Sequence, residues 1–159
     1  MSADPYEILS GSALPAVTRD RVLSLLNGAQ LDMAATAHPE DDTTAVARLN
    51  DLDWIIIVEE GLVRLECVLP TQLGEDVISL FHVLCNEFNS GAFDGRVLVG
   101  TDSGNIELRG DACFVTTAGL SEDQLFHALN VAIINAQEAL LSVLDTFNAT
   151  ARELADSDD

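Results

Sequence analysis

The sequence contains no lysine, and its seven arginines face 27 acidic residues, which gives the 159-residue chain a formal net charge of −20. A field of this sign repels phosphate groups, so nucleic-acid binding is not expected. No basic cluster is present that could hold an anionic membrane surface. The acidity fits simple solubility, a salt-adapted or acid-rich proteome, or an acidic docking face or DNA mimic.

Signal, membrane and disulfide features are also missing. The start of the chain lacks a basic stretch followed by an apolar one, so no signal peptide is expected. The uncharged stretch between Asp123 and Glu138 is too short to cross a bilayer. Cys67, Cys85 and Cys113 are odd in number and widely spaced, which favours reduced thiols over a disulfide framework. These features predict a cytoplasmic protein with no membrane partner.

What the chain does have is apolar content. Hydrophobic residues make up 48% of it, and a chain of this length can bury a core without metal or disulfide support. No internal repeat, low-complexity segment or interior linker is seen. We therefore expect a loose N-terminal arm over residues 1–17, one α+β domain over 18–155 and an acidic tail over 156–159.

Helical spacing and end signals predict three helices, over residues 18–27, 75–89 and 121–154. Thr18 can cap the first helix. Ser121 and Gln124 form a capping box at the start of the third, with serine at the cap and glutamine three positions later.

The clearest strand signal is the apolar run over residues 54–58, whose lack of alternation predicts burial on both faces. Residues 62–69 alternate, complete a β-hairpin and are expected to end at Pro70. A second hairpin is expected over 96–99 and 105–117, with a bulge or bend at Gly110. A short strand is possible over 31–37, within a region, 30–51, whose structure the sequence leaves open.

The resulting order is α-(β)-β-β-α-β-β-α, with parentheses around the uncertain strand. Strands joined by tight turns pair antiparallel, and the helices can cover one face of their sheet. The predicted fold class is therefore α+β, an antiparallel sheet with helices on one face.

The order of three motifs resembles one known family. Asn86-Glu87-Phe88-Asn89 ends the second helix, a hairpin follows, and Gly119-Leu120-Ser121-Glu122-Asp123-Gln124-Leu125 opens the third helix. This arrangement resembles the YbjN family, described as bacterial sensory transduction regulators, over about residues 18–147. The resemblance implies a fold like that of type III secretion chaperones and a regulatory or chaperone-like binding role, with no catalytic residues. Ala92-Phe93-Asp94-Gly95 departs from the family, whose members tend to carry a Trp-Pro segment there.

Motifs for chemistry are weak. His82 and Cys85 share a helix face and could bind zinc with Cys67 or Cys113, but there is no C-x-x-C pair and no second histidine at ligand spacing. The segment 102–105 is typical of a hairpin turn and not of a calcium loop. No phosphate-binding loop or nucleophile motif is present. We therefore predict no catalytic, cofactor-binding or metal-binding residues and no cofactor.

The third helix carries a second apolar line, separate from its main stripe. It consists of Ile134 and Leu141, flanked by the uncharged Asn130, Gln137 and Asn148. Packing on a wide helix face is one interpretation. A seam for a protein partner or a homodimer is the other, since interface centres are poor in charge.

Three functions follow as hypotheses. The leading one is a non-enzymatic, protein-binding regulator or chaperone-like protein of the YbjN type, whose partner the sequence does not identify. The second is a small-ligand binder or an enzyme with an unrecognised site, which should gather His82, Arg64, Arg96 or Arg109 in one deep pocket. The third is a dedicated secretion chaperone.

Overall fold

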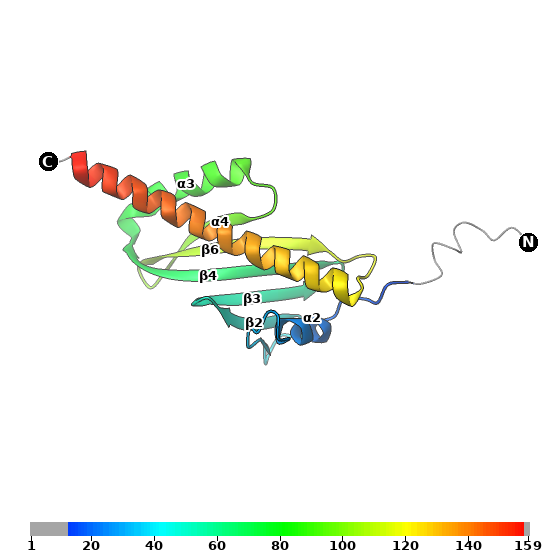
Figure 1. Ribbon diagram of the computed structural model, residues 1–159. Helices are drawn as coiled ribbons and strands as arrows, with labels where there is room; N and C mark the ends of the chain where they lie inside the picture. Colours follow the sequence, from blue (N-terminus) through cyan, green and yellow to red (C-terminus); the bar gives the residue numbers. More distant parts are fainter. Residues whose placement is uncertain (1–12, 158–159) are drawn as a thin grey trace, which may run out of the picture.

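The computed structural model describes residues 13–157, in which one antiparallel sheet of six strands is covered by helices (Figure 1). The strand order across the sheet is β1-β2-β3-β4-β6-β5. The elements are α2 (Arg19–Leu26), β1 (Thr36–Ala37), β2 (Thr44–Leu49), β3 (Leu52–Glu59), β4 (Leu62–Gly74), the 3₁₀ turn η1 (Glu75–Val77), α3 (Ile78–Gly91), β5 (Arg96–Asp102), β6 (Asn105–Val115) and α4 (Glu122–Ser157). This α+β architecture confirms the predicted fold class.

The two ends of the chain lie partly outside the described residues. Of the predicted N-terminal arm, residues 13–17 are described, and they are held in place: the Pro15 carbonyl oxygen accepts hydrogen bonds from the backbone N–H of Leu120 at 3.1 Å and from Nη1 of Arg21 at 2.9 Å. Of the predicted acidic tail, residues 156 and 157 are described, and they continue α4.

The strand β2 lies in the region that the sequence left open. It pairs with β3 along its whole length, from Thr44 opposite Ile57 to Leu49 opposite Leu52. The connecting residues Asn50 and Asp51 have φ values of 54° and 61°. A two-residue hairpin loop with positive φ at both positions favours asparagine, aspartate and glycine, so the Asn-Asp pair was the missed signal.

Pro70 does not end β4, contrary to the sequence prediction. The strand continues to Gly74, with an irregular register between Pro70 and Gly74. Pairing between β3 and β4 stops at Asp53 opposite Val68. Among the described strands, β4 therefore has a neighbour on one side only at Pro70, and a proline is tolerated at such a position.

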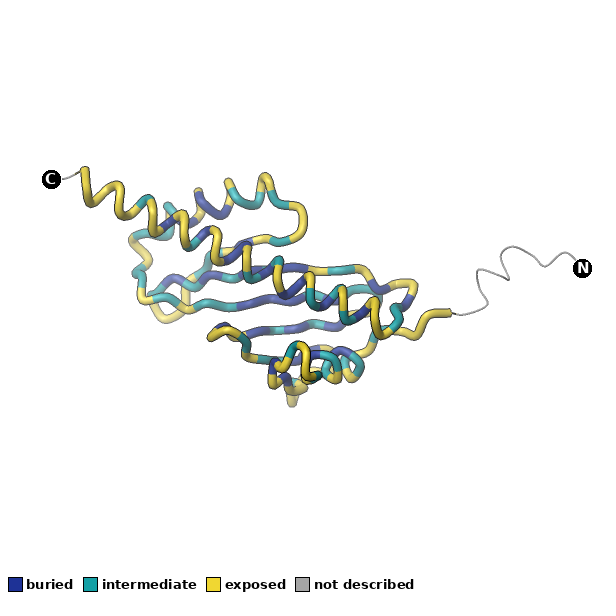
Figure 2. Tube along the Cα trace, viewed as in Figure 1, coloured by how far each residue is buried: buried dark blue, intermediate teal, exposed yellow. Residues whose placement is uncertain are grey.

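One face of the sheet is covered by the helices, and the other, here called the open face, is not covered by any helix of the described part (Figures 1 and 2). Trp54, Ile56 and Val58 of β3 point toward the helices and are buried, whereas Ile55 and Ile57 lie half-buried on the open face. The expected burial of this strand on both faces is therefore wrong. Burial alternates along β3, but the sequence does not show this alternation because both faces carry apolar, β-branched residues.

Gly110 marks a close approach and not the expected bulge. The register between β4 and β6 is regular around it, with Cys67 opposite Gly110 and Leu65 opposite Ala112. A Cβ atom at Gly110 would collide with the carbonyl oxygen of Ala136 on α4. The absence of a side chain therefore lets α4 lie directly on β6.

The helix α4 supplies a large part of the core. Its buried side chains are Leu125, Leu129, Ala132, Ile133, Ala136, Ala139, Leu140, Val143 and Phe147. Phe147 stacks on Phe81 of α3, with 4.3 Å between the ring centroids. Leu154, at the end of the helix predicted over residues 121–154, is 59% exposed because the last turns of α4 reach past the sheet (Figure 1).

By length and composition α4 is also apolar enough to cross a membrane. In this structure its apolar stripe packs on the sheet, as the core helix of a globular protein does.

The predicted caps are present at both helices. Ser121 Oγ accepts a hydrogen bond from the N–H of Gln124 at 3.2 Å, and Gln124 Oε1 accepts one from the N–H of Ser121 at 2.9 Å. Thr18 Oγ1 accepts a hydrogen bond from the N–H of Arg21 at 3.3 Å. These side chains satisfy backbone donors that have no partner within the helix.

Candidate functional site

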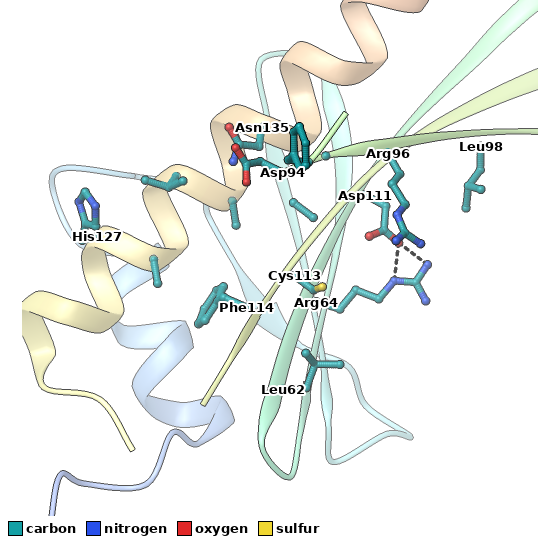
Figure 3. A pocket seen from close by; sticks show the side chains of 16 residues that line it. Leu62, Arg64, Asp94, Arg96, Leu98, Asp111, Cys113, Phe114, His127 and Asn135 are labelled. Atoms are coloured by element: carbon teal, nitrogen blue, oxygen red, sulfur yellow. Dashed lines mark hydrogen bonds and ion pairs between the residues drawn. The ribbon is translucent and has the colours of Figure 1, made fainter. Parts of the chain in front are cut away.

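A groove with a volume of about 610 Å³ lies between β6, the first half of α4 and the loop over residues 92–95 (Figure 3). The sequence places it there because β5 starts late. Pairing between β5 and β6 begins at Arg96 opposite Asp111, whereas β6 continues to Val115. Gly95 packs against α4, where a Cβ atom would stand 2.6 Å from the carbonyl oxygen of Asn135. The loop is thus drawn toward the helix, and the end of β6 is left beside a groove.

Apolar side chains line this groove and stay exposed to solvent. Phe93 is 100% exposed, Leu98 45% and Val131 39%. Phe114 of β6 is half-buried in the same lining, and Val115, which follows it, is 70% exposed. Apolar side chains that gather in this way mark an interaction site more often than single exposed ones do.

A row of alternating charges crosses the open face beside the groove. Arg64 donates from Nε to Asp111 at 2.6 Å and from Nη2 to Glu66 at 3.1 Å. Arg109 donates to the other oxygen of Glu66 at 2.7 Å and to Glu107 at 2.7 Å. We call these five residues the arginine–carboxylate row. It links β4 to β6, and its central member, Glu66, is buried.

Each of the three carboxylates in this row accepts a hydrogen bond from a guanidinium group, which fixes the positions of these side chains. The hydrogen bond to Glu107, followed by the one to Glu66, raises the pKa of Arg109 above its ordinary value. The row therefore acts as a structural link between two strands.

Arg96 differs from the arginines of the row. It is the first residue of β5, it is exposed, and it makes no ion pair within residues 13–157. It borders the groove next to Arg64 and Asp111 (Figure 3). A cation without a partner at the edge of an apolar groove can bind a carboxylate.

The residues expected to gather in an enzyme pocket are only partly together. Arg64 and Arg96 line the groove, whereas Arg109 belongs to the row without lining the groove. His82 is exposed on α3 and is not part of the lining. The histidine that does line the groove is His127, exposed near the start of α4.

The possible zinc ligands point into different surroundings. His82 is exposed, while Cys85 and Cys67 are buried. Loss of hydration on burial raises the pKa of the Cys67 and Cys85 thiols to about 11. Within residues 13–157 no three His, Cys, Asp or Glu side chains lie close enough together to hold a metal ion.

The apolar line predicted on α4 is exposed. Ile134 is 45% and Leu141 40% exposed. Of the flanking residues, Asn148 is exposed and Asn130 is half-buried. Gln137 is already engaged, because its Oε1 accepts a hydrogen bond from Asn50 at 3.0 Å. The use of this line as an interface stays a prediction.

Sequence reasoning missed the groove itself. Phe93, which is 100% exposed, is an aromatic residue in the loop between Gly91 and Gly95. The late start of β5 relative to the end of β6 could be read only after the strand pairing was known. The local signal was therefore Phe93, at the position where the chain departs from the YbjN pattern.

Comparison with known proteins places the fold. No protein-family model matches the chain, and no curated protein matches it in sequence. Among solved structures it is similar to the crystal structure of YbjN, a proposed transcription regulator from E. coli, with a TM-score of 0.67 and 10% sequence identity. The match covers 84% of this chain and 95% of YbjN. The expected resemblance to YbjN is thus confirmed at the level of the fold.

Proposed function

We propose that this chain is a non-enzymatic regulator that acts by binding another protein. The observation that carries the proposal is the composition of the groove: Phe93, Leu98 and Val131 are exposed around it, while Asp111, which also lines it, is held by Arg64. Exposed apolar groups with a polar rim are typical of a protein-binding surface. YbjN, whose fold is similar, is described as a proposed transcription regulator, which agrees with a regulatory role.

The charge of the chain restricts how such regulation would work. With a net charge of −20 and no lysine, the protein as a whole repels DNA phosphates. If it regulates transcription, it does so through contacts with another protein. A chaperone-like role, including that of a dedicated secretion chaperone, would also work through contacts with another protein. In that role the groove would hold part of a client protein.

A second candidate function is binding of a small ligand. A volume of about 610 Å³ falls within the range of ligand-binding sites. The exposed Phe93 and Arg96 at its rim favour a protein partner, because a small-molecule site usually keeps its aromatic groups inside the pocket.

Affinity capture from native lysate at low and high salt tests the proposal. The parent protein is compared with Phe93→Asp and with Val83→Asp, a control that adds the same charge at an exposed position of α3. A partner protein should be retained by the parent and by the control and lost with Phe93→Asp. Identical capture by all three proteins, or turnover of a metabolite by the purified protein, would contradict the proposal.

A further inference from the structure

Within residues 13–157 the end of β6 has a neighbouring strand on one side only. On the β4 side its pairing continues to Val115 opposite Leu62, and Thr116 extends it with a hydrogen bond from its N–H to the Gly61 carbonyl oxygen at 2.8 Å. On the β5 side its pairing stops at Asp111 opposite Arg96. Residues 112–115 therefore form a free strand edge, and this edge borders the groove.

The backbone of this edge has a defined direction. In an antiparallel sheet successive residues direct their N–H and C=O groups to alternate sides of the strand. Since Thr116 bonds toward β4, Cys113 and Val115 direct their backbone groups away from β4, to the side where β5 is missing. An added strand could bond to these two residues, and exposed strand edges are common sites for such addition.

The side chains around the edge define what an added strand should carry. Successive residues of a strand point to opposite faces. On the helix side the groove offers Phe114 and Val131, which suit aliphatic side chains. Arg96 lies opposite Asp111, two residues before Cys113. On the open face, a residue of the added strand opposite Cys113 would therefore be the nearest neighbour of Arg96 on the same side of the sheet. The guanidinium group of Arg96 makes no ion pair within residues 13–157.

We propose that a partner protein inserts an extended segment that pairs with residues 112–115 of β6. In this segment aliphatic residues alternate with polar ones, and a carboxylate stands opposite Cys113, beside Arg96. This inference rests on the proposed function and names the site and the chemistry of the partner. A second copy of the chain is a poorer occupant: if it paired through its own residues 112–115, it would place no carboxylate opposite Cys113, because this edge contains none.

The test uses a labelled peptide with blocked ends, Thr-Val-Glu-Val-Thr, whose binding is followed by fluorescence anisotropy. Two analogues accompany it: one with glutamine in place of glutamate, and one N-methylated at the residues that would bond to the edge. On the protein side, Val115→Pro removes an edge N–H without affecting the pairing with β4, and Arg96→Glu reverses the rim charge. Thermal melting shows whether both variants fold.

We expect N-methylation and Val115→Pro each to weaken binding at least about tenfold, which corresponds to about 1.4 kcal/mol. Arg96→Glu should weaken binding of the glutamate peptide more than that of its glutamine analogue. Failure of the parent peptide to bind at millimolar concentration overturns the inference, and so does equal binding of the N-methylated peptide. The N-methylated peptide decides the matter even if Val115→Pro does not fold.

The two proposals can fail separately. If a natural partner is lost with Phe93→Asp but retained by a folded Val115→Pro, the protein-binding function stands and strand addition is wrong. If the parent protein sediments as a dimer and Val115→Pro as a monomer, a second copy occupies the edge and the inference is likewise wrong. If no captured protein depends on either residue, the proposed function itself fails.

Discussion

The side chains of Asn27 and Asn89 each form two hydrogen bonds with the backbone of the residue eight positions later. The carboxamide of Asn89 accepts a hydrogen bond from the N–H of Val97 and donates one to its carbonyl oxygen, both at 2.8 Å. Asn27 makes the same pair of bonds to Ala35, at 2.6 and 2.9 Å. In both places a side chain thus satisfies backbone groups that pair with no strand of the described part.

Replacement of Asn89 by aspartate should therefore loosen the outer edge of β5. The carboxylate cannot donate to the Val97 carbonyl oxygen, which would face a negative charge in its place. We expect a loss of about 1–3 kcal/mol of stability by chemical denaturation. The matched control is Asn86→Asp, which adds the same charge at an exposed position of α3. Equal effects of the two substitutions would show that the hydrogen bonds between Asn89 and Val97 do not contribute to the free energy of unfolding.

Gly110 should be intolerant of any side chain. The Cβ of Gly110→Ala would meet the Ala136 carbonyl oxygen and would stand 2.9 Å from the sulfur of Cys67, so α4 would have to move off the sheet. We expect a loss of about 3 kcal/mol or more. Gly100→Ala on β5 is the control, because a Cβ atom there meets nothing within 4 Å. Similar unfolding midpoints for the two variants would mean that α4 does not lie on β6 as described.

The three thiols should differ in reactivity. Cys113 is exposed, whereas Cys67 and Cys85 are buried. N-ethylmaleimide at neutral pH should therefore modify Cys113 quickly and the other two only after unfolding, as peptide mass spectrometry can show. Rapid labelling of Cys67 in the folded protein would show that this part of β4 is not buried in the core as described.

The buried thiols also predict a loss of stability at alkaline pH. Burial raises the pKa of Cys67 and of Cys85 from 9.0 to about 11. Below pH 9 both thiols are protonated in the folded and the unfolded chain alike. Between about pH 9 and 11 they ionise more readily in the unfolded chain, which favours unfolding. Denaturation midpoints should fall across this range in the parent protein and fall less in a Cys67→Ala, Cys85→Ala variant.

Self-association through α4 is the remaining prediction. Ile134 and Leu141 are exposed on a helix whose neighbouring asparagines and glutamine carry no charge. If they form a dimer seam, Ile134→Glu with Leu141→Glu should convert the dimer to a monomer in sedimentation experiments, while Val83→Glu, on α3, should not. A parent protein that is monomeric at high concentration rules out the homodimer, and a double variant that still dimerises shows that another surface is used.

The sequence predicted the elements whose signals are local. The capping box of Ser121 and Gln124 and the spacing of apolar residues on α4 depend on a few neighbouring residues, and the structure bears them out. Pro70 and Gly110 were interpreted wrongly for a shared reason. The effect of each depends on its surroundings in the folded protein. At Pro70 the pairing with β3 has already stopped, and at Gly110 the backbone of α4 lies against the sheet.

The candidate site could not be predicted from the sequence for a related reason. The groove exists because β6 extends beyond β5, and this is a relation between two strands and not a property of either one. Single residues of the groove, such as Arg64 and Arg96, were considered only as part of a possible enzyme pocket. Their place at a free strand edge follows from the pairing register.

The insertion of β6 between β4 and β5 also sets an order of events during synthesis. The strands β1 to β4 leave the ribosome in sequence and can pair as they emerge, but the second edge of β4 receives its neighbour only after α3 and β5 have been made. The buried stripe of α4 arrives later still. Until then the nascent chain presents a bare central strand and an apolar sheet face, both prone to aggregation. Slow translation of the segment over residues 75–121 would prolong this exposure, so the yield of soluble protein should depend on the speed at which this segment is made.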